Sequence, residues 1–189
     1  MAFCKWLTQK LHDGLLPAGP LTGDLKQYII TLPHEYEWEV AARWPNEDVQ
    51  ERIYPWGSEF DAAKANTREG DSIGETTIVG MYPAGKNKAL DIYDLSGNVW
   101  EWCRNRYGKP ESNMDPTMVD MGAVSCTLRG GSWDDNADLV RAASRNYGRL
   151  YARAVSRNVN FPDNRNASYG FRVVVVRVPI MDFYHNEAE

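Results

Sequence analysis

The sequence predicts an α+β fold with few helices, short strands and long loops. Helical spacing of apolar residues is confined to two stretches near the start of the chain, and short strand-like segments gather toward its end. Long irregular stretches lie between the helical and the strand-like segments, and the chain contains 15 Gly and 10 Pro, which favour loops. Its 7 Trp and 10 Tyr can anchor such loops. The 189 residues, 43% of them hydrophobic and 25% charged, suit one globular domain.

Two helices are predicted in the first quarter of the chain. Over residues 1–12 apolar side chains recur at nearly helical spacing, at Phe3, Trp6, Leu7 and Leu11. The Gly-, Pro- and Leu-rich residues 13–31 are expected to form a loop. A second helix begins near Pro33 and continues to about Arg43. His34 occupies its capping position and Glu37 follows three residues later, which is the pattern of a capping box.

Four short strands are predicted after a mostly irregular stretch that reaches about residue 90. They lie around Ile92–Tyr93, Val99–Cys103, Thr127–Gly130 and Phe171–Val178. The run Val173–Val176 is continuously β-branched, which is typical of a central strand that is buried on both faces. The three cysteines, Cys4, Cys103 and Cys126, are odd in number and show no spacing pattern, so reduced buried thiols are expected in place of disulfides.

A series of ordered motifs then links the chain to a known family. The motifs are Leu32–Arg43, Tyr54–Gly57, Tyr93–Trp102, Arg129–Trp133 and the closing Gly170–Arg172. Together they resemble the formylglycine-generating-enzyme domain, a variant of the C-type lectin fold. The resemblance implies a small twisted antiparallel sheet, two helices and long loops, within a domain over residues 1–180 followed by a tail over 181–189. His34 departs from the small capping hydroxyl usual in the family.

The residues that carry catalysis in the related enzymes are missing from this sequence. The generating enzyme uses a copper-binding cysteine pair shortly after the Arg-Gly-Gly-Ser motif, but the matching stretch Asp134–Val140 contains no cysteine. The iron-dependent sulfoxide synthases use a histidine cluster, whereas His12, His34 and His185 share no ligand spacing. We therefore expect no redox cofactor and no enzymatic activity. The alternative is an enzyme or a regulatory domain of this family with an unrecognised site.

Residues 134–169 have an unusual composition. The segment contains no Lys, Glu, Gln, Met or Trp and is rich in Asn, Asp, Ser, Tyr and Arg, a composition also found in antibody paratopes. It resembles the variable cassette of proteins diversified by diversity-generating retroelements, in which mutagenesis at template adenines rewrites Asn codons. The resemblance implies a non-catalytic scaffold that displays a hypervariable ligand-binding surface. The display candidates are Asp135, Asn136, Asp138, Asn146, Tyr147, Tyr151, Asn158, Asn160, Asn164, Asn166, Ser168 and Tyr169.

Arginines of the same segment are expected to hold loops through hydrogen bonds to backbone carbonyls. These are Arg141, Arg145, Arg157, Arg165 and Arg172. A polar loop inherited from the enzyme scaffold, without any ligand, is the alternative for the whole segment. The Arg-Ala-x-Ser-Arg frame occurs twice, at 141–145 and 153–157, which suggests a local insertion.

The family resemblance also implies structural calcium at two loop sites. The first would use Asp94, Gly97, Val99 and Glu101, and the second Asn66, Thr67, Asp71 and Ile73. Carboxylate and carbonyl oxygens are suitable ligands for this hard cation. The alternative is that the acids cap turns or pair with arginines.

The expected partner is a protein or glycan ligand, and other domains of a longer parent chain are a further expectation. The net charge of −5 gives no overall attraction to nucleic acid. No apolar run reaches the length of a membrane span, and the start of the chain does not have the pattern of a signal peptide. The sequence does not identify the location, and both a cytoplasmic location and display on a cell or virion surface stay open.

Overall fold

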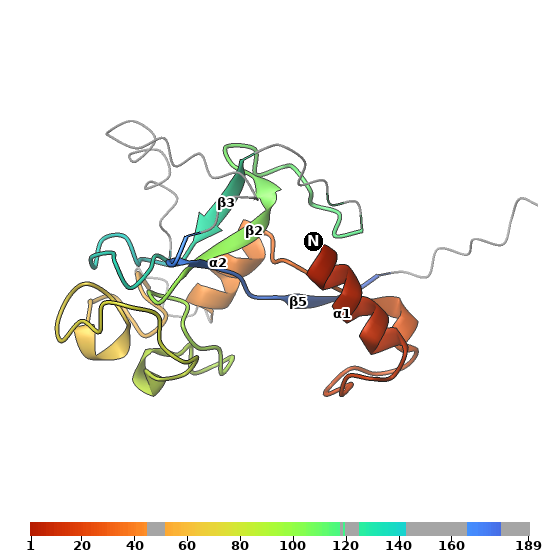
Figure 1. The fold of residues 1–189 in the computed structure, drawn as a ribbon, viewed down its shortest axis with the longest axis horizontal. Coiled ribbons are helices and arrows are strands. Elements are labelled where there is room, and N and C mark those ends of the chain that lie inside the picture. Colours follow the sequence, from red (N-terminus) through yellow and green to blue (C-terminus); the bar gives the residue numbers. More distant parts are fainter. Residues whose placement is uncertain (45–51, 118, 120–124, 143–165, 179–189) are drawn as a thin grey trace, which may run out of the picture.

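The computed structural model describes residues 1–44, 52–117, 119, 125–142 and 166–178 of the chain. Within these, two α-helices and five strands lie among long loops, which confirms the predicted α+β class. The strands form two separate sheets, one with the order β1-β5 and one with the order β3-β2-β4. Figure 1 labels β5 of the first sheet and β2 and β3 of the second. Three short 3₁₀-helices, Leu25–Gln27, Ala62–Lys64 and Pro83–Gly85, interrupt the loops.

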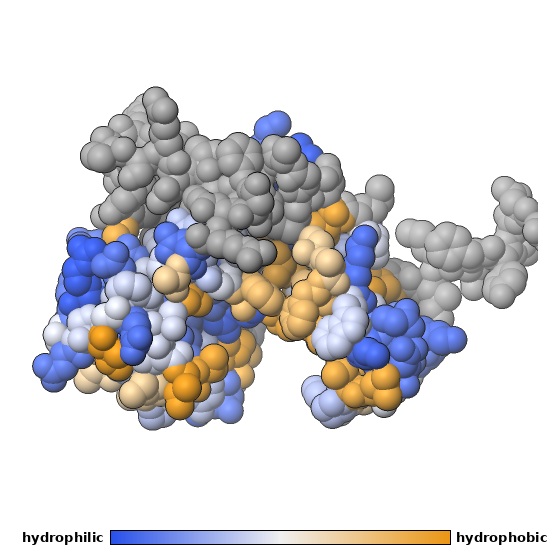
Figure 2. Space-filling model, in the orientation of Figure 1, coloured by the Kyte–Doolittle hydropathy of each residue, from blue (hydrophilic) through white to orange (hydrophobic). Residues whose placement is uncertain are grey.

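The first helix packs on the two-stranded sheet. Helix α1 (Ala2–His12) contributes Leu7 and Leu11 to a small core that also includes Tyr28 and Ile30 of β1 (Tyr28–Thr31). Strand β1 pairs antiparallel with β5 (Val174–Arg177), which joins the two ends of the described chain. Apolar residues remain on the surface where β5 passes α1, in the middle of the view in Figure 2.

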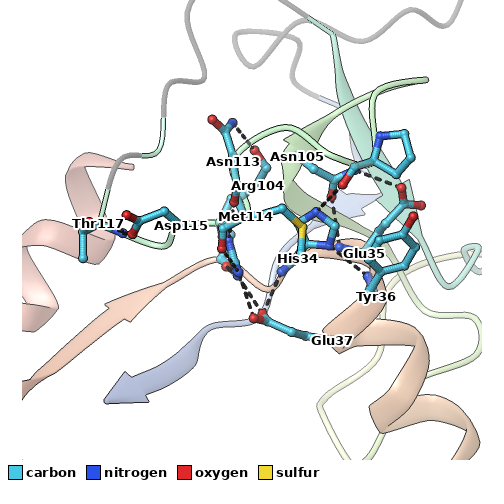
Figure 3. Close-up of polar contacts among 12 residues, drawn as sticks. His34, Glu35, Tyr36, Glu37, Arg104, Asn105, Asn113, Met114, Asp115 and Thr117 are labelled. Atoms are coloured by element: carbon cyan, nitrogen blue, oxygen red, sulfur yellow. Dashed lines mark hydrogen bonds and ion pairs between the residues drawn. The ribbon is translucent and has the colours of Figure 1, made fainter. Parts of the chain in front are cut away.

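Helix α2 (Glu35–Arg43) begins at the predicted capping box. The His34 Nδ1 accepts the Tyr36 N–H at 3.2 Å, and the Glu37 Oε2 accepts the His34 N–H at 2.9 Å. Arg104, which lies on strand β2 (Trp100–Arg106), donates two hydrogen bonds to the Glu37 carboxylate, at 2.6 and 2.8 Å, as Figure 3 shows. A histidine ring nitrogen therefore takes the role of the usual hydroxyl, and no helix-cap bond is lost.

The three-stranded sheet lies against α2. Its middle strand, β2 (Trp100–Arg106), pairs antiparallel with β3 (Cys126–Arg129) and parallel with the two-residue β4 (Tyr169–Gly170). Because side chains alternate along a strand, Glu101 and Cys103 face inward while Trp100 and Trp102 face outward. The inward face meets the second core cluster, formed by Trp38, Ala42, Leu95, Cys103 and Ala142.

Three predictions about elements were wrong. Residues 28–31 form β1, although the Gly- and Pro-rich residues before them predicted a loop throughout 13–31. Ile92 makes only an isolated bridge to Asn87 and no strand. The β-branched run at β5 predicted a central strand, but among the described residues β5 has a neighbour on one side only.

Candidate functional site

The turn directly before the predicted variable segment requires glycine at two positions. Gly130 and Gly131 have φ values of 95° and 72°, in the left-handed region. A Cβ on Gly131 would lie 2.6 Å from Cγ1 of Val140, and one on Gly130 would lie 3.1 Å from the Trp38 ring. The Arg-Gly-Gly-Ser motif thus brings the following loop, residues 132–142, onto the core around α2.

Asp135 organises this loop from within. Its Oδ2 accepts the Ser132 N–H at 2.9 Å and the Ser132 hydroxyl at 2.6 Å. Burial raises the pKa of Asp135, although the bonds from Ser132 and the side chain of Trp100 act in the opposite direction. Its backbone carbonyl accepts the Arg68 N–H at 2.9 Å. The side chain predicted for display is therefore half-buried and bonded within its own loop.

The rest of the loop alternates between anchors and exposed polar side chains. Leu139, Val140 and Ala142 are buried, and the Val140 carbonyl accepts the Ser96 hydroxyl at 2.7 Å. Asn136 and Asp138, two of the predicted display residues, are exposed. A further set of contacts reaches the loop from residues 54–69, where Arg68 pairs with Asp134, Glu69 accepts the Ala137 N–H and Tyr54 donates to the Ala137 carbonyl.

Display candidates at the far end of the segment lie on and before β4. The Asn166 Oδ1 accepts both the N–H and the hydroxyl of Ser168, at 2.9 and 3.0 Å, and Asn166 itself is exposed. Tyr169 is half-buried and meets Trp102 edge-on, with ring centroids 6.0 Å apart. Six further candidates lie outside the described residues, namely Asn146, Tyr147, Tyr151, Asn158, Asn160 and Asn164.

Trp100 brings the two described parts of the segment together. Its backbone N–H donates to the Ser168 carbonyl at 2.8 Å, and its side chain bonds the Asp135 carboxylate. In the sequence, Trp100 stands out only as part of the Tyr93–Trp102 motif. Its position at the start of β2, two residues before Trp102 on the same outward face, is the sequence signal that identifies it in retrospect.

Beneath this surface lies a buried ionic network. The Arg172 Nε and Nη2 bond the two oxygens of Glu101 at 2.5 and 2.6 Å, and Trp38 donates its indole N–H to the same carboxylate at 2.6 Å. Arg172 also donates to the carbonyls of Tyr93 and Asp94, each at 3.1 Å. Burial lowers the pKa of Arg172, but the Glu101 carboxylate outweighs it and raises the value, so the guanidinium stays charged.

The prediction that arginines hold loops is thus confirmed for Arg172. The exposed Arg141 differs, because it forms an ion pair with Asp138 at the surface. Arg145, Arg157 and Arg165 lie outside the described residues.

The donor set of the first calcium prediction does not fit a cation. Both Glu101 oxygens accept from Arg172, and the Asp94 Oδ2 accepts the Gly80 N–H at 2.9 Å. The Gly97 carbonyl accepts the Val99 N–H at 3.0 Å. A guanidinium therefore bonds the Glu101 carboxylate that calcium would need. This is the alternative in which the acids pair with arginines or cap turns.

The second calcium set fits in one respect. Asn66 is 2% exposed, and no hydrogen-bond partner is found for its Oδ1. Such a buried, unpaired oxygen suits a hard cation. Thr67 beside it is buried, whereas Asp71 and Ile73 are exposed. In the part of the chain that the structure describes, no group of three or more His, Cys, Asp or Glu side chains could hold a metal.

Among the residues that the structure describes, cysteine and histidine side chains offer little to redox chemistry, and His185 lies outside them. Cys4, Cys103 and Cys126 are all buried and form no disulfide, as predicted. Burial raises the pKa of Cys103 well above its usual value, which disfavours the thiolate that copper binds. His12 contacts the Tyr28 carbonyl at 2.8 Å, and His34 caps α2 while its Nε2 contacts the Pro110 carbonyl at 2.9 Å.

Fold and motifs together define an α+β domain of the formylglycine-generating-enzyme type. The chain belongs to the family described as Sulfatase-modifying factor enzyme 1-like domain, which matches residues 1–177. It is 35% identical over 150 residues to inactive C-alpha-formylglycine-generating enzyme 2 of Mus musculus, covering 75% of this chain and 41% of that protein. The chain thus spans less than half the length of this relative.

The family also contains enzymes. Hercynine oxygenase of Mycolicibacterium thermoresistibile is 35% identical over 126 residues, which cover 61% of this chain and 28% of the enzyme. Among solved structures, Treponema denticola variable protein 1 superposes with a TM-score of 0.59 and 22% identity, over 93% of this chain and 67% of that one. At this identity the likeness shows the fold alone.

Proposed function

We propose that this domain is a non-catalytic scaffold that binds a protein or glycan ligand through a diversified surface within residues 134–169. The observation that carries the proposal is that buried side chains anchor the described loop while other side chains of the same loop are exposed. Leu139 and Val140 anchor it to the core, while Asn136 and Asp138 face solvent. Changing the exposed side chains leaves the anchors intact, so many surfaces can be displayed on one backbone.

Diversification by a retroelement is supported by the composition of the segment. The absence of Lys, Glu, Gln, Met and Trp fits mutagenesis at the adenines of Asn codons. A structural neighbour whose name describes it as a variable protein has the same fold. Three described candidates also contribute to the framework. Asp135 bonds Ser132 and Trp100, Asn166 bonds Ser168, and Tyr169 packs against Trp102.

Two observations favour a binding role over an enzymatic one. The formylglycine-generating enzymes that the sequence resembles have copper-binding cysteines shortly after the Arg-Gly-Gly-Ser motif, whereas the matching residues of this chain include no cysteine. A relative at 35% identity carries the word inactive in its name, although other relatives are enzymes. Hydrogen bonds that hold the described loop to the core, together with a charge-paired framework, reduce the ordering cost of binding, which is the physical requirement for a display scaffold.

Calcium at the second site, around Asn66, is part of the proposal as a structural cofactor. The unpaired Asn66 Oδ1 supports it. We further propose that the domain extends to residue 180, that it acts within a longer parent chain, and that it is either cytoplasmic or displayed on a cell or virion surface. Among the described residues, no helix combines the length and the apolar character that crossing a membrane requires.

The test pairs sequence comparison with binding. Natural isolates that match outside 134–169 but differ at the display positions are expected. Arrays of cell-surface proteins and glycans, with and without calcium, are then probed with the natural chain and with a variant carrying Asn136→Ala and Asp138→Ala. Lost binding with an unchanged Tm supports the proposal. Identical residues at these positions in all isolates would argue against diversification, and binding unaffected by the variant would argue against this surface.

A further inference from the structure

The two edges of the small β1-β5 sheet are treated differently. On the β1 edge, α1 supplies polar partners: the Ile30 N–H donates to the Thr8 hydroxyl at 2.8 Å, and that hydroxyl also lies 3.3 Å from the Ile30 carbonyl. His12 contacts the Tyr28 carbonyl at 2.8 Å. The outward groups of β1 are therefore satisfied by a neighbouring helix.

No described residue does this for β5. The Val178 N–H donates to the Gln27 carbonyl at 2.7 Å, which fixes the alternation of the ladder. Since Val176 and Val174 follow at intervals of two, they also face β1, and the backbone groups of Val175 and Arg177 point away from it. This open row of donors and acceptors is a template for another strand.

The side chains beside this edge form an exposed apolar patch, which we call the β5 patch and define by Phe3, Trp6, Phe171, Val173 and Val175. Between 38% and 53% of each is exposed. Phe3 stacks on Trp6 with ring centroids 5.7 Å apart and meets Phe171 edge-on at 5.6 Å. In the view of Figure 1, α1 crosses the end of β5, and Figure 2 shows apolar residues in the same part of the view.

The patch and the edge lie on the same side of the molecule. Val175 is paired with Ile30, so both side chains point to the sheet face that α1 covers. Helix α1 buries Ile30 but leaves Val175 45% exposed. The β-branched run Val173–Val176, which suits a central strand, therefore lies at the edge of the sheet and is only partly covered.

We propose that a second copy of this chain covers the β5 patch through antiparallel pairing of the two β5 strands. Antiparallel pairing about a two-fold axis satisfies the outward groups of both strands, because identical rows meet. The axis keeps Val175 and α1 of both copies on one face of a continuous four-stranded sheet. The two patches are then adjacent and bury each other.

The patch itself places no charge at the contact with a second copy. Each copy has a net charge of −5, which opposes association in general, but the five patch residues carry no charge, so no like charges meet where the two patches touch. Arg177 at the edge bonds the Gln27 Oε1 at 3.1 and 2.8 Å. Pairing of the two β5 strands would extend each helix-covered two-stranded sheet into four paired strands with a shared apolar face.

Sedimentation velocity of the full chain across a concentration series tests the proposal. We expect a dimer, and Val175→Lys should shift it to monomer because it places a charge on each side of the axis. Val79→Lys is the matched control, since Val79 is 79% exposed on a turn outside the patch, and it should leave the dimer intact. Circular dichroism of both variants checks that each is folded.

Amide hydrogen exchange gives a second readout that needs no mutation. The Val174 and Val176 amides should be protected at every concentration. Those of Val175 and Arg177 should slow several-fold as the concentration rises. A chain that stays monomeric at all concentrations, with fast exchange at Val175, overturns the proposal. So does a dimer that Val175→Lys leaves unchanged.

Discussion

Two arginine–carboxylate pairs, one below the predicted variable surface and one on it, show how the domain divides stability from display. Arg172 and Glu101 are 23% and 6% exposed, and the carboxylate also accepts the Trp38 indole. Arg68 and Asp134 are 65% and 59% exposed. The chemistry is the same, but water screens the second pair and hardly reaches the first.

The difference explains which residues can change. Arg172 ties β2 to the loop before it through the carbonyls of Tyr93 and Asp94, so its loss would disturb the backbone under the surface. The exposed Asp134 side chain pairs with Arg68 at the surface, so its loss would not disturb the backbone in this way. A framework with buried pairs and a surface with exposed pairs lets side chains vary without moving the loops that carry them.

The sharpest test removes one partner of each pair. Glu101→Gln leaves the Arg172 charge without its counter-ion, and we expect a loss of about 3–5 kcal/mol in the free energy of unfolding. Asp134→Asn should cost about 0–1 kcal/mol. Urea denaturation of the two variants and the natural chain measures both values. Similar losses in the two variants would mean that the framework and the surface are not separate.

Glycines sharpen the same comparison. Gly131 and Gly74 have nearly equal positive φ values, 72° and 76°, so alanine brings similar backbone strain of about 1–2 kcal/mol at each. At Gly131 the new Cβ also overlaps Val140, which adds about 1–3 kcal/mol, whereas at Gly74 nothing lies within 4 Å. The larger loss of Tm should follow Gly131→Ala. Equal losses would show that the loop is not seated on the core as described.

Sequence reasoning found the elements whose signals are local. The capping box at His34 and Glu37 identified the start of α2, and helical spacing identified α1. Strand β1 was not predicted, because it is defined by pairing with β5, which lies at the other end of the chain. Strand β4 is two residues long and pairs parallel with β2, so no periodicity could reveal it.

The candidate site was predictable as a segment but not residue by residue. Composition marked residues 134–169, yet Asp135 and Asn136 look alike in sequence and differ in the structure. Asp135 bonds Ser132, while Asn136 is exposed. Trp100, which joins the two described parts, lies more than thirty positions before the segment. Such assignments depend on tertiary contacts that spacing does not contain.

Histidine capping makes the helix start sensitive to pH. Burial first, and then the Arg104 charge, lowers the pKa of His34, so the folded state binds fewer protons than the unfolded chain. The stability it contributes is complete above the unfolded pKa of about 6.5 and is lost as the pH falls through the lower folded value. His34→Ser keeps a cap without this titration, while His34→Ala costs about 1 kcal/mol at neutral pH.

Denaturation of the natural chain and His34→Ser between pH 7 and pH 5 measures the difference. The natural chain should lose more stability over this range. The Glu37 carboxylate does not interfere, because the Arg104 and His34 bonds outweigh the opposing effect of burial and lower its pKa, which places its titration below this window. A serine variant with the same pH slope would show that the cap is not the titrating group.

The smallest effect is expected at the displayed side chains themselves. Asn136 and Leu139 are joined by a backbone bond of 3.0 Å from the Leu139 N–H to the Asn136 carbonyl, so they share one turn but face opposite environments. Asn136→Tyr should change the unfolding free energy by no more than about 0.5 kcal/mol. Leu139→Ala, at 5% exposure, should cost about 2–5 kcal/mol because it leaves a cavity. Thermal melts of this pair decide whether the turn separates display from core, since a large loss at Asn136 would place that side chain in the framework beside Asp135.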